Sequence, residues 1–289
     1  MRPVCLYHAN CVDGFTAAWV VNKFYDGAVD LVAVAYGDPI PQACRSRDVI
    51  LVDFSFKRDR LHDLKHLAKS VLVLDHHKTA EEDLREYAVD WPDVTPAVPD
   101  DGQVLAVFDM DRSGAGLAWD WFFPKTPRPA IVKHVEDRDL WKFKIEGTKA
   151  LHGVFASYPF DLETWDKLAA ACEDGAKRRN MLREGEAIAR KHLMDVRSVY
   201  EATKRKMIIG GYPVMVCNAP PGMASDLGNL MAKMQLFGAT YFDTADNKRA
   251  FSLRSIGDFD VSAIAKDYGG GGHRNAAGFS RPKGWEGDT

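Results

Sequence analysis

The fold is decided by the stretch Val71-Leu72-Val73-Leu74-Asp75-His76-His77, in which four apolar residues run into a carboxylate and two imidazoles. Two earlier stretches have the same form, since Val4-Cys5-Leu6-Tyr7 runs into His8 and Val49-Ile50-Leu51-Val52 runs into Asp53. Apolar residues at helical spacing lie between these runs, at 14–24 and 60–68. Continuous apolar strands separated by helices are typical of a mostly parallel sheet with helices on both faces. We therefore predict an α/β fold for the N-terminal part of the chain.

The polar residues at the ends of these strands have a position in common. In an open α/β sheet, ligands bind outside the carboxyl ends of the strands. Three of the predicted strands deliver a candidate ligand at that end, namely His8, Asp53 and Asp75, while a fourth strand at 31–35 does not. The sequence therefore places a candidate site at one edge of the sheet.

The remainder of the chain suggests a division into domains, since 289 residues suit two domains of ordinary size. We predict a catalytic domain over 1–161, a helical connector over 162–205, and a smaller C-terminal α/β domain with a mixed sheet over 206–289. Residues 91–103, rich in Pro, Asp and Val, predict a loop. Residues 281–289 predict a frayed terminus.

Composition excludes several classes of protein. The net charge of -3 does not indicate binding to a long duplex, although the chain is mildly basic from Arg197 onward and acidic before it. Five cysteines without a CxxC pair predict reduced thiols and exclude a zinc ribbon. Neither a signal segment nor an apolar run of membrane-spanning length is seen. We expect a soluble cytoplasmic protein with no membrane partner.

Four clusters of candidate ligands stand out in the first domain. They are His8 to Gly14, Asp53, Asp75-His76-His77, and Glu136-Asp137-Arg138-Asp139. Buried aspartates repel one another unless cations neutralise them. Oxygen and imidazole ligands suit Mn²⁺ or Mg²⁺, and two such ions can activate water and stabilise both oxygens of a phosphoryl transfer. Asp53 is our choice for a carboxylate that bridges two ions.

Each of these features also has a purely structural interpretation. A single Asp after a strand is commonly a helix cap or a turn residue. Cys11 could contact a metal or pack as a buried thiol. Trp141, after the acidic cluster, could stack on a base, although core packing is the commoner role of such a residue. The coincidence of four clusters in one domain favours the metal site.

The last domain contains a second pattern, Gly269-Gly270-Gly271-Gly272-His273-Arg274-Asn275. Glycines let backbone N–H groups approach an anion, and His273 and Arg274 add cationic donors. We therefore predict phosphate binding rather than packing or a flexible linker. Arg254 is a further candidate for substrate contact, with an exposed salt bridge as its alternative. The candidates in this domain are Arg254, Gly270, Gly271, Gly272, His273 and Arg274.

In their order along the chain, these motifs resemble those of the DHH phosphoesterases, whose signature is Asp-His-His, here Asp75-His76-His77. The stretch Gly-Gly-Gly-His-Arg-Asn-Ala-Ala-Gly-Phe resembles the signature of the DHH-associated C-terminal domain. The resemblance covers nearly the whole chain. It implies two domains with a cleft between them, two Mn²⁺ ions in the first domain, and substrate held by the second.

The resemblance also implies roles for individual residues. Asp53 would bridge the ions, His77 would lie nearer the substrate, and Asp75 would order the two histidines. The implied metal ligands are His8, Asp13, Asp53, His76 and Asp137, with Asp139 and Cys11 as alternatives. The implied catalytic residues are Asp53, Asp75, His76 and His77.

One departure from the family pattern lies in Cys11-Val12-Asp13-Gly14, where the family usually has two aspartates two residues apart before the glycine. The first of these aspartates is absent here. Either one metal is bound more weakly, or Asn10 or Cys11 takes its place.

The function that follows is two-metal-dependent hydrolysis of phosphodiester bonds in short oligonucleotides, as in the nanoRNases and exonucleases of this family. The alternatives are a phosphatase of 3′-phosphoadenosine 5′-phosphate-type nucleotides, a cyclic dinucleotide phosphodiesterase, and a catalytically weak nucleotide-binding protein. The expected cofactor is Mn²⁺, with Mg²⁺ as the alternative. The expected partner is a short single-stranded oligonucleotide or a small nucleotide, and a homodimer is left open.

Overall fold

The computed structural model describes residues 1–91 and 98–289, so residues 92–97 of the predicted 91–103 loop lie outside the described part. The chain forms two compact units, Met1–Ala189 and Arg190–Thr289. The boundary falls within one long helix, α8 (Gly175–Thr203). The predicted connector is built from this helix and α7 (Leu162–Glu173), which are separated at Asp174.

The first unit is built on a parallel sheet, as predicted. Its five strands lie in the order β2-β1-β3-β4-β5, and all neighbouring strands pair in parallel. The first four were predicted from their apolar runs, and the last was not. The strands are β1 (Val4–His8), β2 (Asp30–Val34), β3 (Asp48–Val52), β4 (Ser70–Asp75) and β5 (Val104–Phe108).

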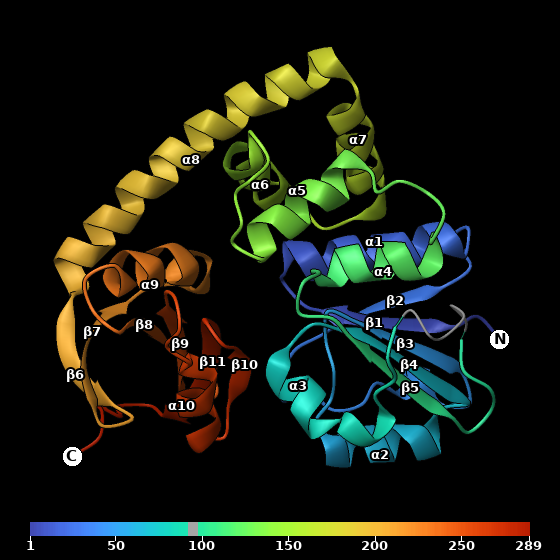
Figure 1. Cartoon of the computed structure of the whole chain (residues 1–289), viewed down its shortest axis with the longest axis horizontal. Helices are drawn as coiled ribbons and strands as arrows, with labels where there is room; N and C mark the ends of the chain where they lie inside the picture. The colour runs from blue at the N-terminus through green and yellow to red at the C-terminus, as the bar shows by residue number, and fades with distance from the viewer. Residues whose placement is uncertain (92–97) are drawn as a thin grey trace. The chain divides into compact units, whose positions relative to one another are not determined.

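Helices cover both faces of this sheet, because alternate strand residues point to opposite sides. In β3, Ile50 packs in one core with α1 (Val12–Phe24), α4 (Gly114–Phe122), α5 (Ala130–Asp139), α6 (Thr148–Ser157) and α7. Leu51 packs in the other core with α2 (Arg58–Leu67). Figure 1 shows α1 and α4 along one face and α2 on the other. The short helix α3 (Lys78–Asp83) and two 3₁₀ turns, Gln42–Cys44 and Arg85–Tyr87, complete the unit.

The second unit has a mixed sheet, also as predicted. Six strands lie in the order β10-β11-β9-β8-β7-β6, and only β7 and β8 pair in parallel. Separate cores on its two faces include residues of α9 (Ala224–Ala232), which follows the turn Pro221–Met223, and of α10 (Val261–Asp267). The strands are β6 (Arg205–Ile209), β7 (Tyr212–Asn218), β8 (Phe237–Asp243), β9 (Lys248–Ser255), β10 (Gly271–His273) and β11 (Ala276–Pro282).

The glycine-rich stretch has a packing role that the sequence analysis did not foresee. Strand β10 begins at Gly271 and pairs antiparallel with β11 at the end of the sheet. A Cβ atom on Gly270 would lie 2.0 Å from the carbonyl oxygen of Gly278, and one on Gly272 would lie 2.6 Å from that of Ala276. Gly272 also has a φ of 137°. The expectation that these glycines do not serve packing is therefore corrected at Gly270 and Gly272.

The C-terminal residues are bound to the second unit rather than frayed. Trp285 packs against its core, and Glu286 pairs with Arg249. The carboxylate of Asp288 accepts a hydrogen bond from the Tyr268 hydroxyl, and its backbone N–H donates to Ile208. The prediction of a frayed terminus was wrong because the partners of these residues come from distant parts of the chain, namely β9, the end of α10 and β6.

Among the helices in residues 1–91 and 98–289, none has the length and apolar character that a bilayer crossing requires.

Candidate metal centre

The candidate site lies at the carboxyl end of the parallel sheet in the first unit. His8 ends β1, Asp53 follows β3, and Asp75 ends β4. Strands β1 and β3 are neighbours, and the strand order reverses there because β2 lies outside β1. Such a switch point is where ligands bind in open α/β sheets. His8 and Asp53 therefore occupy the position that the sequence predicted.

Asp53 is the centre of this site. Its carboxylate is buried, with Oδ1 3.0 Å from Nε2 of His76 and Oδ2 3.7 Å from Nδ1 of His8. In the described part of the chain, Oδ2 has no hydrogen-bond partner. Burial acts to raise the pKa of Asp53, but the contact with His76 and the charges of both histidines hold it well below its usual value. An ionised, buried oxygen without a hydrogen bond fits a metal ligand.

The backbone at Asp53 is strained. Its φ of 53° lies in the left-handed region, which side chains other than Gly, Asn and Asp rarely adopt. Gly114 packs directly against it, since a Cβ atom there would lie 2.4 Å from Cβ of Asp53 and 2.9 Å from Oδ2 of Asp13. The fold thus holds two carboxylates close together in a geometry that a larger residue at 114 would prevent.

Asp13 is held by the N-terminus of helix α4. Its Oδ2 accepts a hydrogen bond of 2.6 Å from the Gly114 N–H, and its Oδ1 accepts one of 3.1 Å from the Ala115 N–H. A helix N-terminus favours negative charge. Burial together with the charges of Asp53 and Asp139 nevertheless raises the pKa of Asp13 well above its usual value. A cation between these carboxylates would relieve that repulsion.

His76 brings the carboxylates together. Its Nε2 atom lies 3.0 Å from Oδ1 of Asp53, 3.6 Å from Oδ2 of Asp139 and 3.9 Å from Oδ2 of Asp13. Burial acts to lower the pKa of His76, but the contact with Asp53 and the charges of all three carboxylates raise it to about 10. The metal-free site therefore holds a proton where three acids converge.

Asp75 contacts both histidines that follow it, one through the backbone and one through the side chain. Its Oδ1 lies 2.7 Å from Nδ1 of His77 and accepts a hydrogen bond of 2.8 Å from the His76 N–H, while its Oδ2 accepts one of 2.7 Å from the Ser55 hydroxyl. Although burial acts to raise it, the pKa of Asp75 is lowered to about 2 by the charge and hydrogen bond of His77. A carboxylate that contacts Nδ1 fixes the orientation and the tautomer of the imidazole.

Asp137 and Asp139 have different surroundings. The carboxylate of Asp137 accepts hydrogen bonds from the backbone N–H groups of Lys144, at 2.7 Å, and Ile145, at 3.1 Å. Together with a hydrogen bond from Thr148, these lower the pKa of Asp137 against the opposite effect of burial. Asp139, by contrast, reaches His76. Of the two candidate metal ligands in the acidic cluster, Asp139 lies near His76, and Asp137 binds the backbone of the turn that follows α5.

Within the first unit, the described ligand atoms form three groups, each with members within 4.8 Å of one another. They are His8, Cys11 and Asp53, then Asp13, His76 and Asp139, and then Asp53, Asp75 and His77. The first two adjoin each other. The contact between Asp53 and His76 joins these two groups. Cys11 precedes α1 beside Asn10, whose φ is 55°. Burial and then the charges of Asp53 and Asp13 raise the pKa of the Cys11 thiol. The donor set of both groups fits divalent cations.

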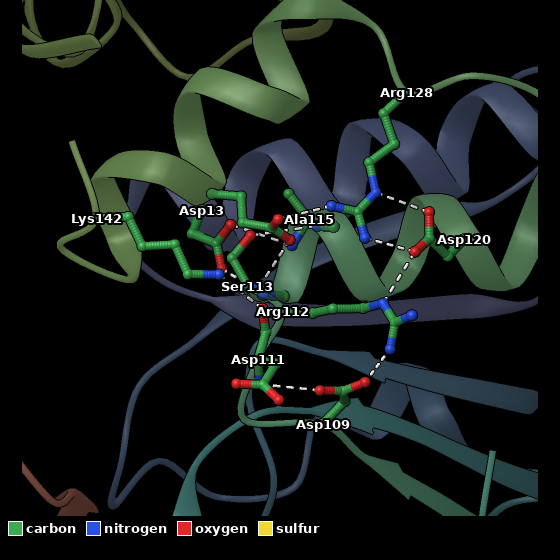
Figure 2. Close-up of polar contacts among 12 residues, drawn as sticks. Asp13, Asp109, Asp111, Arg112, Ser113, Ala115, Asp120, Arg128 and Lys142 are labelled. Carbon is green, nitrogen blue, oxygen red and sulfur yellow. Dashed lines mark hydrogen bonds and ion pairs between the residues drawn. The ribbon is translucent and has the colours of Figure 1, made fainter. Parts of the chain in front are cut away.

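A network of charged residues fixes the α4 terminus that holds Asp13 (Figure 2). Arg128 donates to Asp120 on α4 and to Glu136 on α5, both at 2.7 Å. The other oxygen of Glu136 accepts a hydrogen bond of 3.2 Å from the Ser113 N–H. Arg112 extends the network from Asp120 to Asp109. From the sequence, Glu136 was named only as a member of the acidic cluster, and the others were missed because Arg128 binds acids on two different helices, α4 and α5.

The candidate substrate-binding residues of the second unit form hydrogen bonds within that unit. Arg254 donates to the Ser225 hydroxyl at 3.0 Å and to the Leu253 carbonyl at 2.8 Å. Arg274 donates to the Asp258 carbonyl at 2.6 Å, and half of its side chain is exposed. His273 ends β10, and Arg274 follows in the turn to β11. The described contacts place Arg274 at an accessible turn.

Comparisons with known proteins agree with this architecture. The DHHA1 domain model matches residues 218–287. The protein named Uncharacterized protein R106 of Acanthamoeba polyphaga mimivirus is 31% identical over 303 residues, which covers 96% of this chain and 67% of that protein.

Two solved structures are similar in fold. One is an exopolyphosphatase-related protein from Bacteroides fragilis, with a TM-score of 0.52 and 12% identity over 99% of this chain and 87% of that chain. The other is the DHH domain of a member of a family of ribosomal proteins, with a TM-score of 0.51 and 14% identity over 98% of this chain and 83% of that chain.

A parallel sheet with aspartates and histidines at its carboxyl edge, joined to a DHHA1 domain, defines a class of phosphoester hydrolases. The chain belongs to the DHH family of phosphoesterases.

Proposed function

We propose that this phosphoesterase depends on two metal ions and hydrolyses phosphodiester bonds in short single-stranded oligonucleotides, with Mn²⁺ as its metal. The observation that carries the proposal is the contact of Asp53 with His76, which joins two adjoining groups of ligand atoms. We assign Asp53 to both ions, His8 and Cys11 to one, and Asp13, His76 and Asp139 to the other. Imidazole and carboxylate together favour Mn²⁺ over the harder Mg²⁺.

The chain's own residues would carry the remaining tasks. A pair of divalent ions supplies activation of a water and stabilisation of the charge that develops in phosphoryl transfer. Asp75 holds His77 through Nδ1 and so sets the orientation of an imidazole that would lie near the substrate. The amides of Gly114 and Ala115 keep Asp13 in place while the negatively charged substrate binds. In the second unit, Arg254, His273 and Arg274 are proposed to hold a phosphate that is not attacked.

A substrate panel tests this proposal. Purified protein would be assayed with Mn²⁺ and with Mg²⁺ on RNA and DNA of two to ten nucleotides, cyclic dinucleotides, 3′-phosphoadenosine 5′-phosphate and pyrophosphate. We expect the highest kcat/KM on the short oligonucleotides in Mn²⁺. A preference for the bisphosphate or for a cyclic dinucleotide would reassign the substrate. No hydrolysis of any substrate, with fewer than two ions bound per chain, would favour a nucleotide-binding protein instead.

A further inference from the structure

The turn after α5 has an unusual backbone. Trp141 and Phe143 have φ values of 55° and 47°, in the left-handed region that bulky side chains avoid. Asp137 holds them there, because its carbonyl oxygen accepts hydrogen bonds from the N–H groups of Lys142 and Phe143, at 2.9 and 3.2 Å. Its carboxylate binds the next two N–H groups of the turn. Strain of this kind persists where the surroundings impose it, and it is commonly found at ligand sites.

The two aromatic rings of this turn lie among cations. The ring centroids of Trp141 and Phe143 are 5.0 Å apart at an interplanar angle of 74°. The Arg138 guanidinium lies 4.1 Å from the Trp141 centroid, and the Lys149 ammonium lies 4.6 Å from the Phe143 centroid. Both aromatic residues are partly exposed, and neither is part of the hydrophobic cores found in the described residues. Core packing therefore does not explain Trp141.

Exposed lysines lie along the turn that carries these rings. Residues 140–149 contain three of them and one acid, Glu146, while Glu136, Asp137 and Asp139 precede the turn on α5. Lys142 reaches from this turn to the Asp111 carbonyl oxygen at 3.1 Å, as Figure 2 shows. The surface also adjoins the metal centre, because Asp139, which lies 3.6 Å from His76, precedes Trp141 by two residues. We name Arg138, Trp141, Lys142, Phe143 and Lys149 the Trp141 platform.

We propose that the Trp141 platform binds a nucleobase and the phosphates next to it in a single-stranded oligonucleotide. Aromatic rings interleaved with cations are the common device for binding single strands, since each base offers a face for stacking and each phosphate a charge. Pyrophosphate and polyphosphate have no base, so they would use the lysines but not Trp141. The inference deepens the proposed function, and it rests on that function only for the position of the scissile phosphate.

Binding without turnover tests the platform. Fluorescence anisotropy would follow a labelled thymidine hexanucleotide and an abasic hexamer of equal charge, each titrated with the full chain in EDTA. We expect the wild type to prefer the strand with bases. Trp141→Ala should weaken binding of that strand by about tenfold, within the range known for stacking of one base on an aromatic side chain. Binding of the abasic strand should not change, and Trp141→Phe should retain most of the affinity.

The controls separate stacking from charge and from folding. Tyr158→Ala removes another exposed aromatic ring of the same unit and should leave both affinities unchanged. Lys142→Gln should reduce the slope of log K against log salt by about 0.7, because one phosphate contact is lost. Equal losses on the two strands after Trp141→Ala, or no loss on either, would overturn the proposal. Trp141→Phe, which keeps an aromatic ring, decides the case if Trp141→Ala lowers the thermal midpoint.

The test of the platform and the test of the proposed function give separate results. Turnover is measured with Mn²⁺ on the substrate panel, whereas the platform is measured in EDTA by its preference for bases. Selective binding by an inactive protein would support the platform and refute the phosphodiesterase.

Discussion

The Nε2 atom of His76 lies 3.0 Å from Oδ1 of Asp53, and this contact joins two adjoining groups of candidate ligands in the first unit. His76 comes from the loop after β4, and Asp53 comes from the loop after β3. Both positions follow from the parallel pairing of neighbouring strands, which delivers their carboxyl ends to one edge.

Separate substitutions of Asp137 and Asp139, the two aspartates of α5, distinguish a metal ligand from a structural residue. Asp139→Asn should lower the number of Mn²⁺ ions bound per chain, measured by elemental analysis after gel filtration, with little change in stability. Asp137→Asn should keep the metal content but lower the free energy of unfolding by about 1–3 kcal/mol, because one of the backbone N–H groups of Lys144 and Ile145 loses a charged acceptor. Loss of metal from Asp137→Asn at unchanged stability would contradict our assignment.

Asp53 offers a test of both charge and backbone. Mutation of a residue that hydrogen-bonds to a metal ligand typically lowers activity by about 10–100-fold. Asp53→Asn should reduce turnover by more than this, because it removes the charge of the carboxylate that is proposed to contact both ions. Its fold should persist, since Asn tolerates the left-handed region. Asp53→Ala removes the same charge but should be less stable by roughly 1–2 kcal/mol in urea titrations in EDTA. Equal stability of the two variants would show that the φ of 53° carries no strain.

The sequence predicted the positions of strand-end residues well, because each of them directly ends an apolar run. The choice between Asp137 and Asp139 needed the packing of α5. Ile131 and Val135 are buried, and Asp139 follows at the same four-residue spacing, but His134 and Asp137 are also buried at helical spacing. Periodicity therefore does not choose between Asp137 and Asp139, and it gives no sign of the turn that Asp137 organises.

Other features depended on partners that are distant in sequence. Strand β5 was missed because the preceding stretch is rich in Pro and Asp, which are typical of loops. The role of Gly270 depends on the carbonyl of Gly278 in a neighbouring strand, and a run of glycines does not reveal such a neighbour. Likewise, Arg128 precedes α5 and binds Asp120 on α4 and Glu136 on α5, and the sequence does not show that these two helices pack together.

Metal binding should release protons. The pKa of His76 is raised to about 10 in the metal-free site, so this imidazole carries a proton at neutral pH and must lose it to become a ligand. The affinity for Mn²⁺ should therefore rise with pH up to about that value. Calorimetry at pH 7.5 in buffers of different ionisation enthalpy should report at least one proton released per chain. Buffer-independent enthalpies would argue against His76 as a ligand.

The same pKa predicts how metal-free stability depends on pH. His76 has a folded-state pKa above its ordinary value of 6.5, so its contribution to stability is fully present below pH 6.5. That contribution should be lost as pH rises towards 10. Chemical denaturation of the wild type and His76→Gln in EDTA between pH 6 and 10 measures the difference, which should shrink with rising pH.

Arg128 should act on the metal centre from a distance. Arg128→Lys keeps the charge but loses the planar fork that binds Asp120 and Glu136 together. The amides that hold Asp13 should then be less well fixed, and the affinity for Mn²⁺ should fall by about tenfold. Arg58→Lys is the matched control, because its ion pair with Glu86 is exposed. Equal metal affinities in the two variants would remove Arg128 from any role in positioning.

Arg274 tests the division of labour between the two units. Its guanidinium lies at an exposed turn and donates to the Asp258 carbonyl, so a phosphate could compete for it at small cost. Contacts made equally with bound substrate and transition state raise affinity without raising kcat. Arg274→Ala should therefore raise KM on a dinucleotide by about tenfold, as expected for a charge-assisted hydrogen bond, with a smaller fall in kcat.

The controls for Arg274 concern the metal and the general loss of charge. Metal content should stay unchanged in Arg274→Ala, because the proposed ligands belong to the first unit. Lys206→Ala removes another exposed cation of the second unit and should leave KM unaltered. A fall in kcat at constant KM would mean that Arg274 acts in the transition state. If neither constant moves, the turn between β10 and β11 serves the fold alone, and the first unit must hold the substrate without it.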